Sequence, residues 1–168
     1  MAVKNLFLIS DTHFGHENIL KFTVDESGTL LRPGFNCIEE HDEHLVDCWN
    51  RTVKPGDHVY HLGDVAIAKR HIQTIKRLNG KKRLVMGNHD IYEVDKYLAA
   101  GFQKVMAYRV FEGWIFSHIP IYADGIVRFK GNIHGHLHAT PSPQGKYHSV
   151  CVEKVNYTPV SFDSINVK

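Results

Sequence analysis

Apolar residues in the first half of the chain follow two alternating spacings. Residues 3–10 form a nearly continuous apolar run, which is typical of a strand buried on both faces. From 36 to 53 the apolar residues recur at helical spacing. Asn36 followed by Glu39 is a variant of the capping box and predicts where this helix starts. The same half predicts two further strands, at 58–62 and 83–86. It also predicts two further helices, at 69–78 and 93–100.

The second half of the chain is predicted to be mainly β-structure. Its strand-like segments lie at 102–111, 114–118, 127–134, 147–155 and 158–168. Residues 23–35, which contain two glycines and a proline, are predicted to form a loop. Strands and helices in alternation, followed by strands alone, indicate an α/β domain with a mixed sheet or two packed sheets. Neither repeats nor a linker interrupt this pattern, so residues 1–168 are predicted to be one domain.

Composition narrows the class of protein without naming a function. With 43% hydrophobic and 23% charged residues, the chain is not typical of disordered, collagen-like or coiled-coil proteins. Cys37, Cys48 and Cys151 lie far apart with no Cys-x-x-Cys pair, which indicates a reducing compartment. No apolar run suits a membrane span or a secretory signal, so we expect a cytoplasmic protein without a membrane partner. A net charge of +2 does not single out nucleic acid, and we interpret the basic run over 69–83 as a solvated face.

Histidine changes this picture, because the chain has 13 of them and several follow predicted strands directly. Ligands of open α/β sheets bind outside the carboxyl ends of strands. The polar residues found at such ends are Asp11, His13, Asp64, Asn88, His89, His118, His136 and His138. Two pairs among them are spaced i and i+2, so in extended chain both members would face one site. Gly63, Gly87 and Gly135 stand beside these residues, where the backbone is expected to turn tightly.

The number and type of these residues indicate two metal ions. Leaving His89 aside, two aspartates, one asparagine and four histidines are more ligands than one ion uses, but two ions sharing a bridging carboxylate would use all of them. With a bridging hydroxide, such a site keeps about one positive charge, which suits an anionic phosphate. These ligand types suit Mn, Fe, Zn, Ni or Co, and we favour Mn.

Five short blocks of the sequence resemble the signature motifs of the calcineurin-like metallophosphoesterase superfamily, in the same order. The blocks are Asp11-x-His13, Gly63-Asp64, Gly87-Asn88-His89-Asp90, His118 and Gly135-His136-x-His138. The segment from Ser10 to Ile19 is similar to a subgroup of small, stand-alone bacterial and phage phosphoesterases. The resemblance implies an αββα sandwich, two facing mixed sheets flanked by helices.

The resemblance also implies a role for each motif residue. Asp11, His13 and His138 would hold one metal, Asn88, His118 and His136 the other, and Asp64 would bridge them. A hydroxide between the metals would attack phosphorus, while His89 would assist the leaving group. The implied activity is that of a phosphodiesterase more than of a monoesterase, with a nucleotide or a nucleic-acid end as a candidate substrate.

Residues outside this set receive weaker assignments. His16, Arg32 and Arg128 are candidate substrate contacts, and for His16 a loop hydrogen bond is equally in keeping with its position. Asp90 is a candidate to orient His89, or else a turn residue, and His134 is a candidate support for the ligands or a buried histidine. The remaining histidines are expected to be structural: His41, His44 and His71 on solvated helix faces, His58 and His61 in strand packing, and His148 in a late strand.

Two other functions stay open from the sequence. A non-catalytic scaffold of the same fold would keep the architecture and lose a ligand or the catalytic histidine, but here every position is present. A dinuclear hydrolase of another bond, such as an amide, would use a similar set of ligands. The oligomeric state does not follow from the sequence.

Overall fold

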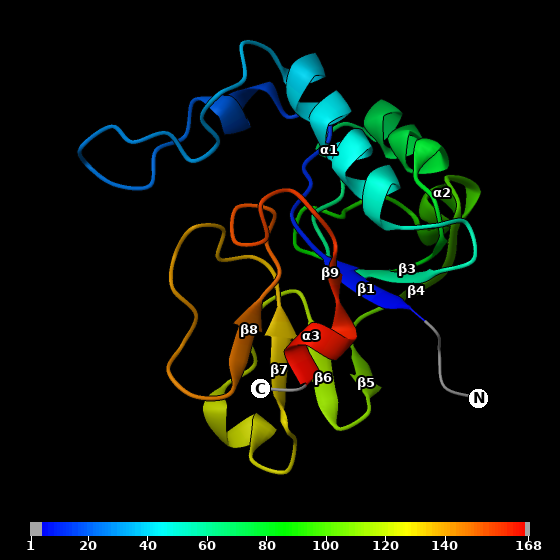
Figure 1. The fold of residues 1–168 in the computed structure, drawn as a ribbon, viewed down its shortest axis with the longest axis vertical. Helices are drawn as coiled ribbons and strands as arrows, with labels where there is room; N and C mark the ends of the chain where they lie inside the picture. The colour runs from blue at the N-terminus through cyan, green and yellow to red at the C-terminus, as the bar shows by residue number, and fades with distance from the viewer. Residues whose placement is uncertain (1–4, 167–168) are drawn as a thin grey trace.

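A computed structural model describes residues 5–166 of the chain, which form two facing β-sheets with helices outside them (Figure 1). The first sheet has the strand order β4-β3-β2-β1-β9 and the second the order β5-β6-β7-β8. The strands of the first sheet are β1 (Leu6–Ile9), β2 (His58–His61), β3 (Lys81–Val85), β4 (Phe102–Met106) and β9 (Val160–Ser161). Those of the second are β5 (Arg109–Phe111), β6 (Trp114–Ser117), β7 (Gly131–His134) and β8 (Tyr147–Ser149). Both sheets are mixed, because β9 and β5 each run antiparallel to their single neighbour.

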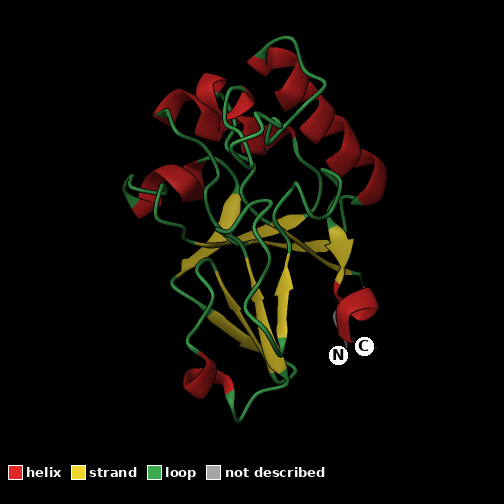
Figure 2. Cartoon of the chain, turned by 90° about the vertical axis from the view of Figure 1, so that its left-hand side faces the viewer, coloured by secondary structure: helices red, strands yellow, loops and turns green. Residues whose placement is uncertain are grey.

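The helices gather mainly on one side of the two sheets, as Figure 2 shows. The α-helices are α1 (Ile38–Thr52), α2 (Val94–Ala99) and α3 (Phe162–Asn166). Three further helices, η1 (Glu17–Leu20), η2 (Lys69–Arg77) and η3 (Ala123–Ile126), are of the 3₁₀ type. The outer face of the second sheet carries little more than η3, whose Ile126 packs with Ile115 and Tyr147. The sandwich predicted from the sequence is confirmed, with a thin fourth layer.

The first strand explains why its sequence is apolar on both faces. Leu6 and Leu8 lie in the core between the two sheets, whereas Ile9 lies in the core under the helices. Each face of β1 therefore meets a buried layer, and all of its residues are buried except Phe7, which is partly buried. The predicted strand began at residue 3, but residues 3 and 4 lie outside the described part of the chain.

The long helix α1 confirms the apolar face predicted for it but not its cap. Leu45, Val46 and Trp49 are all buried under it. Cys37 occupies the N-cap without a side-chain hydrogen bond, and the helix starts at Ile38. The Asn36 N–H instead donates to the Glu40 carboxylate at 2.9 Å, so the capping interaction reaches one residue further along than the sequence pattern suggested.

Four predicted elements in the rest of the chain are shorter or of another kind. Residues 69–77 form a 3₁₀ helix, η2, and bury the expected Ile72 and Ile75. Of the strand predicted at 127–134, only Gly131–His134 is a strand, β7. The strand predicted at 147–155 ends at Ser149, beyond which the chain turns. Residues 158–166 yield β9 and then α3 instead of one strand, because Phe162 and Ile165 face the core at helical spacing. Residues 167–168 lie outside the described part.

Within residues 5–166, none of the helices has the length and apolar character needed to cross a bilayer.

His61, on β2, is a fully buried polar residue that packing alone does not explain. The Thr12 hydroxyl donates to the Val65 carbonyl at 2.9 Å, so it accepts from His61 Nε2, which lies 2.9 Å away. The Gly63 N–H donates to Nδ1 at 3.2 Å. Both ring nitrogens are thus matched to a neutral imidazole, and burial lowers the pKa of His61 to about 3.

We expect this histidine to make the protein less stable in mild acid. A histidine in the unfolded chain has a pKa of about 6.5, so below that pH it binds a proton in the unfolded state, whereas His61 stays neutral in the folded state. Its contribution is complete above pH 6.5 and falls by up to about 1.4 kcal/mol per pH unit as the pH drops toward the folded value. In urea unfolding of the metal-free protein between pH 6.5 and 4.5, His61→Gln should show a slope shallower by about this amount. His44→Gln, a matched change on the half-exposed side of α1, should keep the wild-type slope.

Candidate metal centre

The polar residues at the strand ends form two clusters at one edge of the sandwich. Asp11, His13 and His138 each offer one ligand atom within 4.8 Å of the others. Asp64, His118 and His136 form a second cluster by the same measure. The loops that carry these residues follow β1, β2, β6 and β7, all of which end at the same edge (Figure 1). The parallel pairing of β1 with β2 and of β6 with β7 therefore places residues from distant segments together.

Asp64 lies between the two clusters. Its Oδ2 is 3.6 Å from His13 Nε2 in the first cluster and 3.3 Å from His118 Nε2 in the second. Asn88 joins the second cluster, with its Oδ1 3.0 Å from His118 Nε2. The structure thus brings together all seven residues that the sequence singled out as ligands.

The donor atoms of this site fit a bound cation. Asp11 Oδ1 and His13 Nε2 are buried and have no hydrogen-bonding partner among the described residues, which is costly unless an ion takes that place. Burial lowers the pKa of His13 well below its ordinary value, so its ring is neutral and its lone pair is available. His136 Nδ1 also points at His118 Nε2 from 3.3 Å. Carboxylate oxygens and imidazole nitrogens converging in this way are typical of transition-metal sites.

Asp64 and His118 share a proton-dependent contact. Burial alone would raise the pKa of Asp64, but the hydrogen bond from His118 and its charge outweigh burial and hold that pKa below its usual range. Burial would likewise lower the pKa of His118, yet the Asp64 carboxylate raises it. Binding of a cation by these groups would compete with protonation of His118.

The backbone at the ligands is left-handed. The φ angles are 59° at Asp11, 49° at His13, 58° at Asp64, 69° at His136 and 49° at His138. The i and i+2 pairs therefore face one site because the chain turns sharply, and the extended conformation expected from the sequence is wrong. Aspartate and histidine populate this region more readily than most residues, but it still stores about 1 kcal/mol or more at each position.

Asp90 is the residue that holds two of the ligand loops together. Its carboxylate accepts from the N–H groups of Asp64 at 2.8 Å, Val65 at 3.0 Å and Gly87 at 2.8 Å. Its carboxylate forms no hydrogen bond with the His89 ring, so the structure does not support the expected orienting role. Asp90 fixes the loop after β2 against the loop after β3 instead.

Glu153 is a site residue that sequence reasoning missed. Its Oε1 lies 2.9 Å from His138 Nδ1, so the other ring nitrogen, Nε2, is left for the first cluster. Burial would raise the pKa of Glu153, but His138 and Arg32 more than offset this and lower it. A carboxylate behind a ligating histidine orients the ring and increases its basicity. Nothing in the sequence around Glu153 pointed to it, because it falls in a predicted strand 15 residues from its partner.

Arg32 does not lie where a phosphate contact was expected. It is 1% exposed, and its Nε donates to Glu153 at 2.8 Å. The guanidinium also donates to the main-chain carbonyls of Asp11, at 2.5 Å, and Thr12, at 3.1 Å. The substrate role is therefore replaced by a structural one, in which Arg32 clamps the turn that carries Asp11 and His13. The prediction that His41 lies on a solvated face is also wrong. His41 is fully buried, and its Nε2 lies 3.0 Å from Arg32 Nη1.

Of the other candidate substrate contacts, His89 and His16 lie beside His13, whereas Arg128 lies away from the site. The exposed His89 has its ring 5.6 Å from that of His13, and its backbone N–H donates to Asp64 Oδ1 at 2.9 Å. The His16 ring lies 5.7 Å from that of His13. Arg128 is exposed just before β7, at the opposite end of that strand from His136, so it lies away from the site.

The remaining histidines lie in structural surroundings. His134 is buried, donates from Nδ1 to the Gly135 carbonyl at 2.8 Å and has Nε2 2.9 Å from Ser142 Oγ. This matches the buried, satisfied histidine that the sequence left open. His58 accepts from Arg83, His71 accepts from Arg70, and His148 packs on Trp114.

A two-sheet α/β sandwich with such ligand clusters at its strand ends is typical of metal-dependent hydrolases. Residues 4–163 match the calcineurin-like phosphoesterase family, and the chain belongs to that family. An uncharacterized protein of Methanocaldococcus jannaschii is 34% identical, over 98% of this chain and 91% of its own length.

Two solved structures are similar. A protein of unknown function from Aquifex aeolicus has a TM-score of 0.72 and 26% identity, covering 97% of this chain and 98% of that one. The nuclease MPE of Pseudomonas putida has a TM-score of 0.52 and 20% identity, covering 79% of this chain and 61% of that one, which supports the fold alone. Family membership implies divalent metal ions and phosphate-ester substrates.

Gly87 has no room for a side chain. A Cβ there would overlap the Asp64 carboxylate and come within 2.6 Å of the Asp64 backbone nitrogen. We expect Gly87→Ala to lower the free energy of unfolding by about 1–3 kcal/mol in urea titrations. Gly56→Ala is the control, since a Cβ at Gly56 meets nothing within 4 Å, and its effect should stay within about 0.5 kcal/mol. Equal effects of the two variants would contradict the close packing at Gly87.

Glu153→Gln should weaken metal binding while keeping the volume of the side chain. Loss of a carboxylate behind a ligating histidine typically lowers metal affinity about 10–100-fold. Competition with a chelating dye would measure this affinity. The matched change Glu43→Gln, in an exposed pair with Arg77, should leave it unchanged. Unaltered affinity in a folded Glu153→Gln protein would remove Glu153 from the site.

Proposed function

We propose that this phosphoesterase is a dinuclear-metal-dependent phosphodiesterase. The observation that carries the preference for diesters is that two separate open clefts each have candidate metal ligands in their walls. One cleft, of about 580 Å³, includes His136 and His138 in its wall, and the other, of about 370 Å³, includes Asn88 and His118. A phosphodiester has two substituents that leave phosphorus in different directions, whereas a monoester would fill one cleft only.

The linings of the two clefts support a substrate with flat, apolar groups. Phe22, 47% exposed, lines the first cleft together with Val24, and Tyr108, 62% exposed, lines the second together with Ile119. Exposed aromatic rings stack on nucleobases with little sequence preference. These rings favour a nucleotide diester or a nucleic-acid end as the substrate.

The assignment of the ligands follows the two clusters. Asp11, His13 and His138 would hold one ion, and Asn88, His118 and His136 the other, with Asp64 shared. When bound, the two ions would supply positive charge for the phosphoryl oxygens and lower the pKa of a nucleophilic water. Because five of the seven ligands are neutral when they bind, the site keeps a positive charge that attracts an anionic ester.

His89 is the proposed general acid. Its exposed ring stands beside that of His13 at the mouth of the site, and its backbone is tied to Asp64 Oδ1. This tether fixes the ring relative to the bridging carboxylate. A ring N–H of His89 then gives its proton to the oxygen that leaves phosphorus.

Two further expectations stay predictions: manganese as the preferred metal and the cytoplasm as the location. The scaffold alternative is disfavoured because all seven ligands and His89 are present together. It would gain support from a folded protein that binds metal and hydrolyses no phosphate ester.

The test is hydrolysis of bis-p-nitrophenyl phosphate compared with p-nitrophenyl phosphate by protein reloaded with Mn²⁺. We expect the diester to be the better substrate. His89→Ala should lower kcat about 10²–10⁴-fold without changing metal stoichiometry, whereas Asp64→Asn should lower both activity and metal binding. A faster monoesterase would overturn the diester assignment, and full activity in His89→Ala would remove the general acid.

A further inference from the structure

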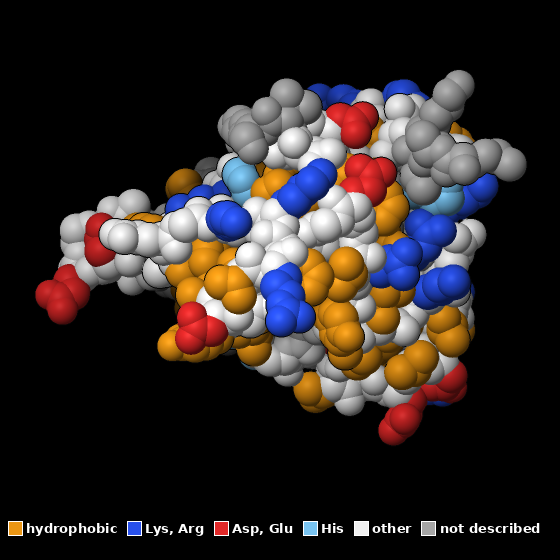
Figure 3. Space-filling view, turned by 90° about the horizontal axis from the view of Figure 1, so that it is seen from below, with side chains coloured by type: hydrophobic (Ala, Val, Ile, Leu, Met, Phe, Trp, Pro, Cys, Tyr) orange, Lys and Arg blue, Asp and Glu red, His pale blue; other side chains and the backbone are white. Residues whose placement is uncertain are grey.

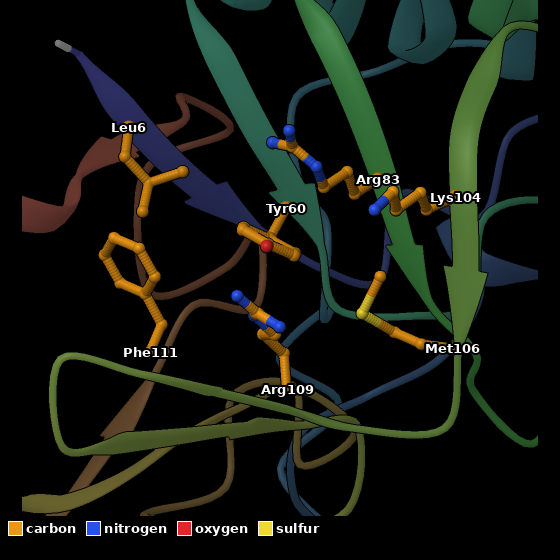
Figure 4. Close-up of a pocket in the computed structure, with 7 residues that line it drawn as sticks. All are labelled: Leu6, Tyr60, Arg83, Lys104, Met106, Arg109 and Phe111. Carbon is orange, nitrogen blue, oxygen red and sulfur yellow. The ribbon is translucent and has the colours of Figure 1, made fainter. Parts of the chain in front are cut away.

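A third cleft lies away from the metal centre, between the two sheets at the edge formed by β3, β4 and β5. Figure 4 shows Arg83 and Lys104 projecting from the first sheet and Arg109 reaching up from β5 toward them. Tyr60, Met106 and Phe111 complete its lining, and its volume is about 160 Å³. It shares no residue with the two clefts at the metal centre.

Three cations and no carboxylate line this cleft. Arg83, Lys104 and Arg109 form no ion pair within the described part of the chain. In Figure 3, Lys and Arg side chains gather among hydrophobic ones on the right of the lower face. Like charges on adjacent strands repel, so this arrangement lowers stability unless an anion is present to offset it.

The environment of Arg83 makes the cleft more than a solvated surface. Its Nη1 donates to His58 Nδ1 at 2.9 Å, and its guanidinium carbon lies 5.5 Å from the centre of the Tyr60 ring. These contacts hold the half-buried guanidinium in place before any ligand arrives. Burial lowers the pKa of His58, and the nearby charges of Arg83 and Lys81 lower it further.

We propose that this cleft binds a compact oxyanion, namely a free phosphate or the terminal phosphate of a monoester. A dianionic phosphate has three or more acceptor oxygens for the two guanidinium forks and the ammonium group, and it fits a volume of this size. Since Arg83 and Lys104 belong to one sheet and Arg109 to the other, the anion would bridge the sheets and stabilise the folded state by mass action.

The test is a phosphate titration of the full chain loaded with Zn²⁺, followed by backbone-amide NMR. Residue-resolved shifts separate this cleft from phosphate bound at the metal centre. We expect saturable shifts at residues 83, 104 and 109, and we expect the same shifts with a nucleoside 5′-monophosphate. Arg109→Gln should weaken this binding about tenfold, and Lys104→Gln should act in the same direction.

Arg128→Gln is the matched control, because Arg128 is an exposed arginine outside the cleft. It should leave the binding curve unchanged. Absence of shifts at the three cleft residues at millimolar phosphate overturns the proposal. Equal weakening of phosphate binding by Arg109→Gln and Arg128→Gln also overturns it. A third contradicting result is a cleft that binds an oligothymidylate without a terminal phosphate but does not bind phosphate. None of these outcomes depends on whether the metal centre hydrolyses diesters.

Discussion

The lone pairs of the seven candidate ligands repel one another, and the loops around the metal centre hold these ligands close together in spite of that repulsion. Asp11 and His13 have buried atoms without partners, and five ligands occupy left-handed backbone. Unsatisfied buried atoms and left-handed residues both disfavour folding. The metal-free site is therefore strained. Cations bound by these lone pairs would relieve the repulsion, and the relief would add to the affinity of the site for metal.

Two buried charged residues hold the strained loops in place. Asp90 joins the loops after β2 and β3 through three backbone N–H groups. Arg32 holds the turn after β1 through two carbonyls and links it to Glu153, and thus to His138. Neither residue faces substrate. Their positions explain how the loops can hold the candidate ligands between two open clefts.

Several elements were predictable because their residues carry local information. The two-sided apolar run of β1 and the apolar face of α1 record which faces are covered, since period and burial are linked by backbone geometry. Prediction failed where tertiary contacts decide. Residues 162–166 form α3 because Phe162 and Ile165 meet the core between the sheets, and the Asn36 N–H donates to Glu40 instead of forming the expected cap.

The sequence by itself determined which residues are candidates for the chemistry. Aspartate, asparagine and histidine at strand ends are candidate metal ligands because the carboxyl ends of parallel strands meet at one edge, where carboxylate and imidazole groups can converge. Only the tertiary structure decided how they are supported. Glu153 behind His138, Arg32 beneath the Asp11 turn and the cationic cleft beside Tyr60 all join segments far apart in the chain. Side-chain contacts of this kind leave no periodic trace, because hydrogen bonds and charges act over a few ångströms in space and not along the sequence.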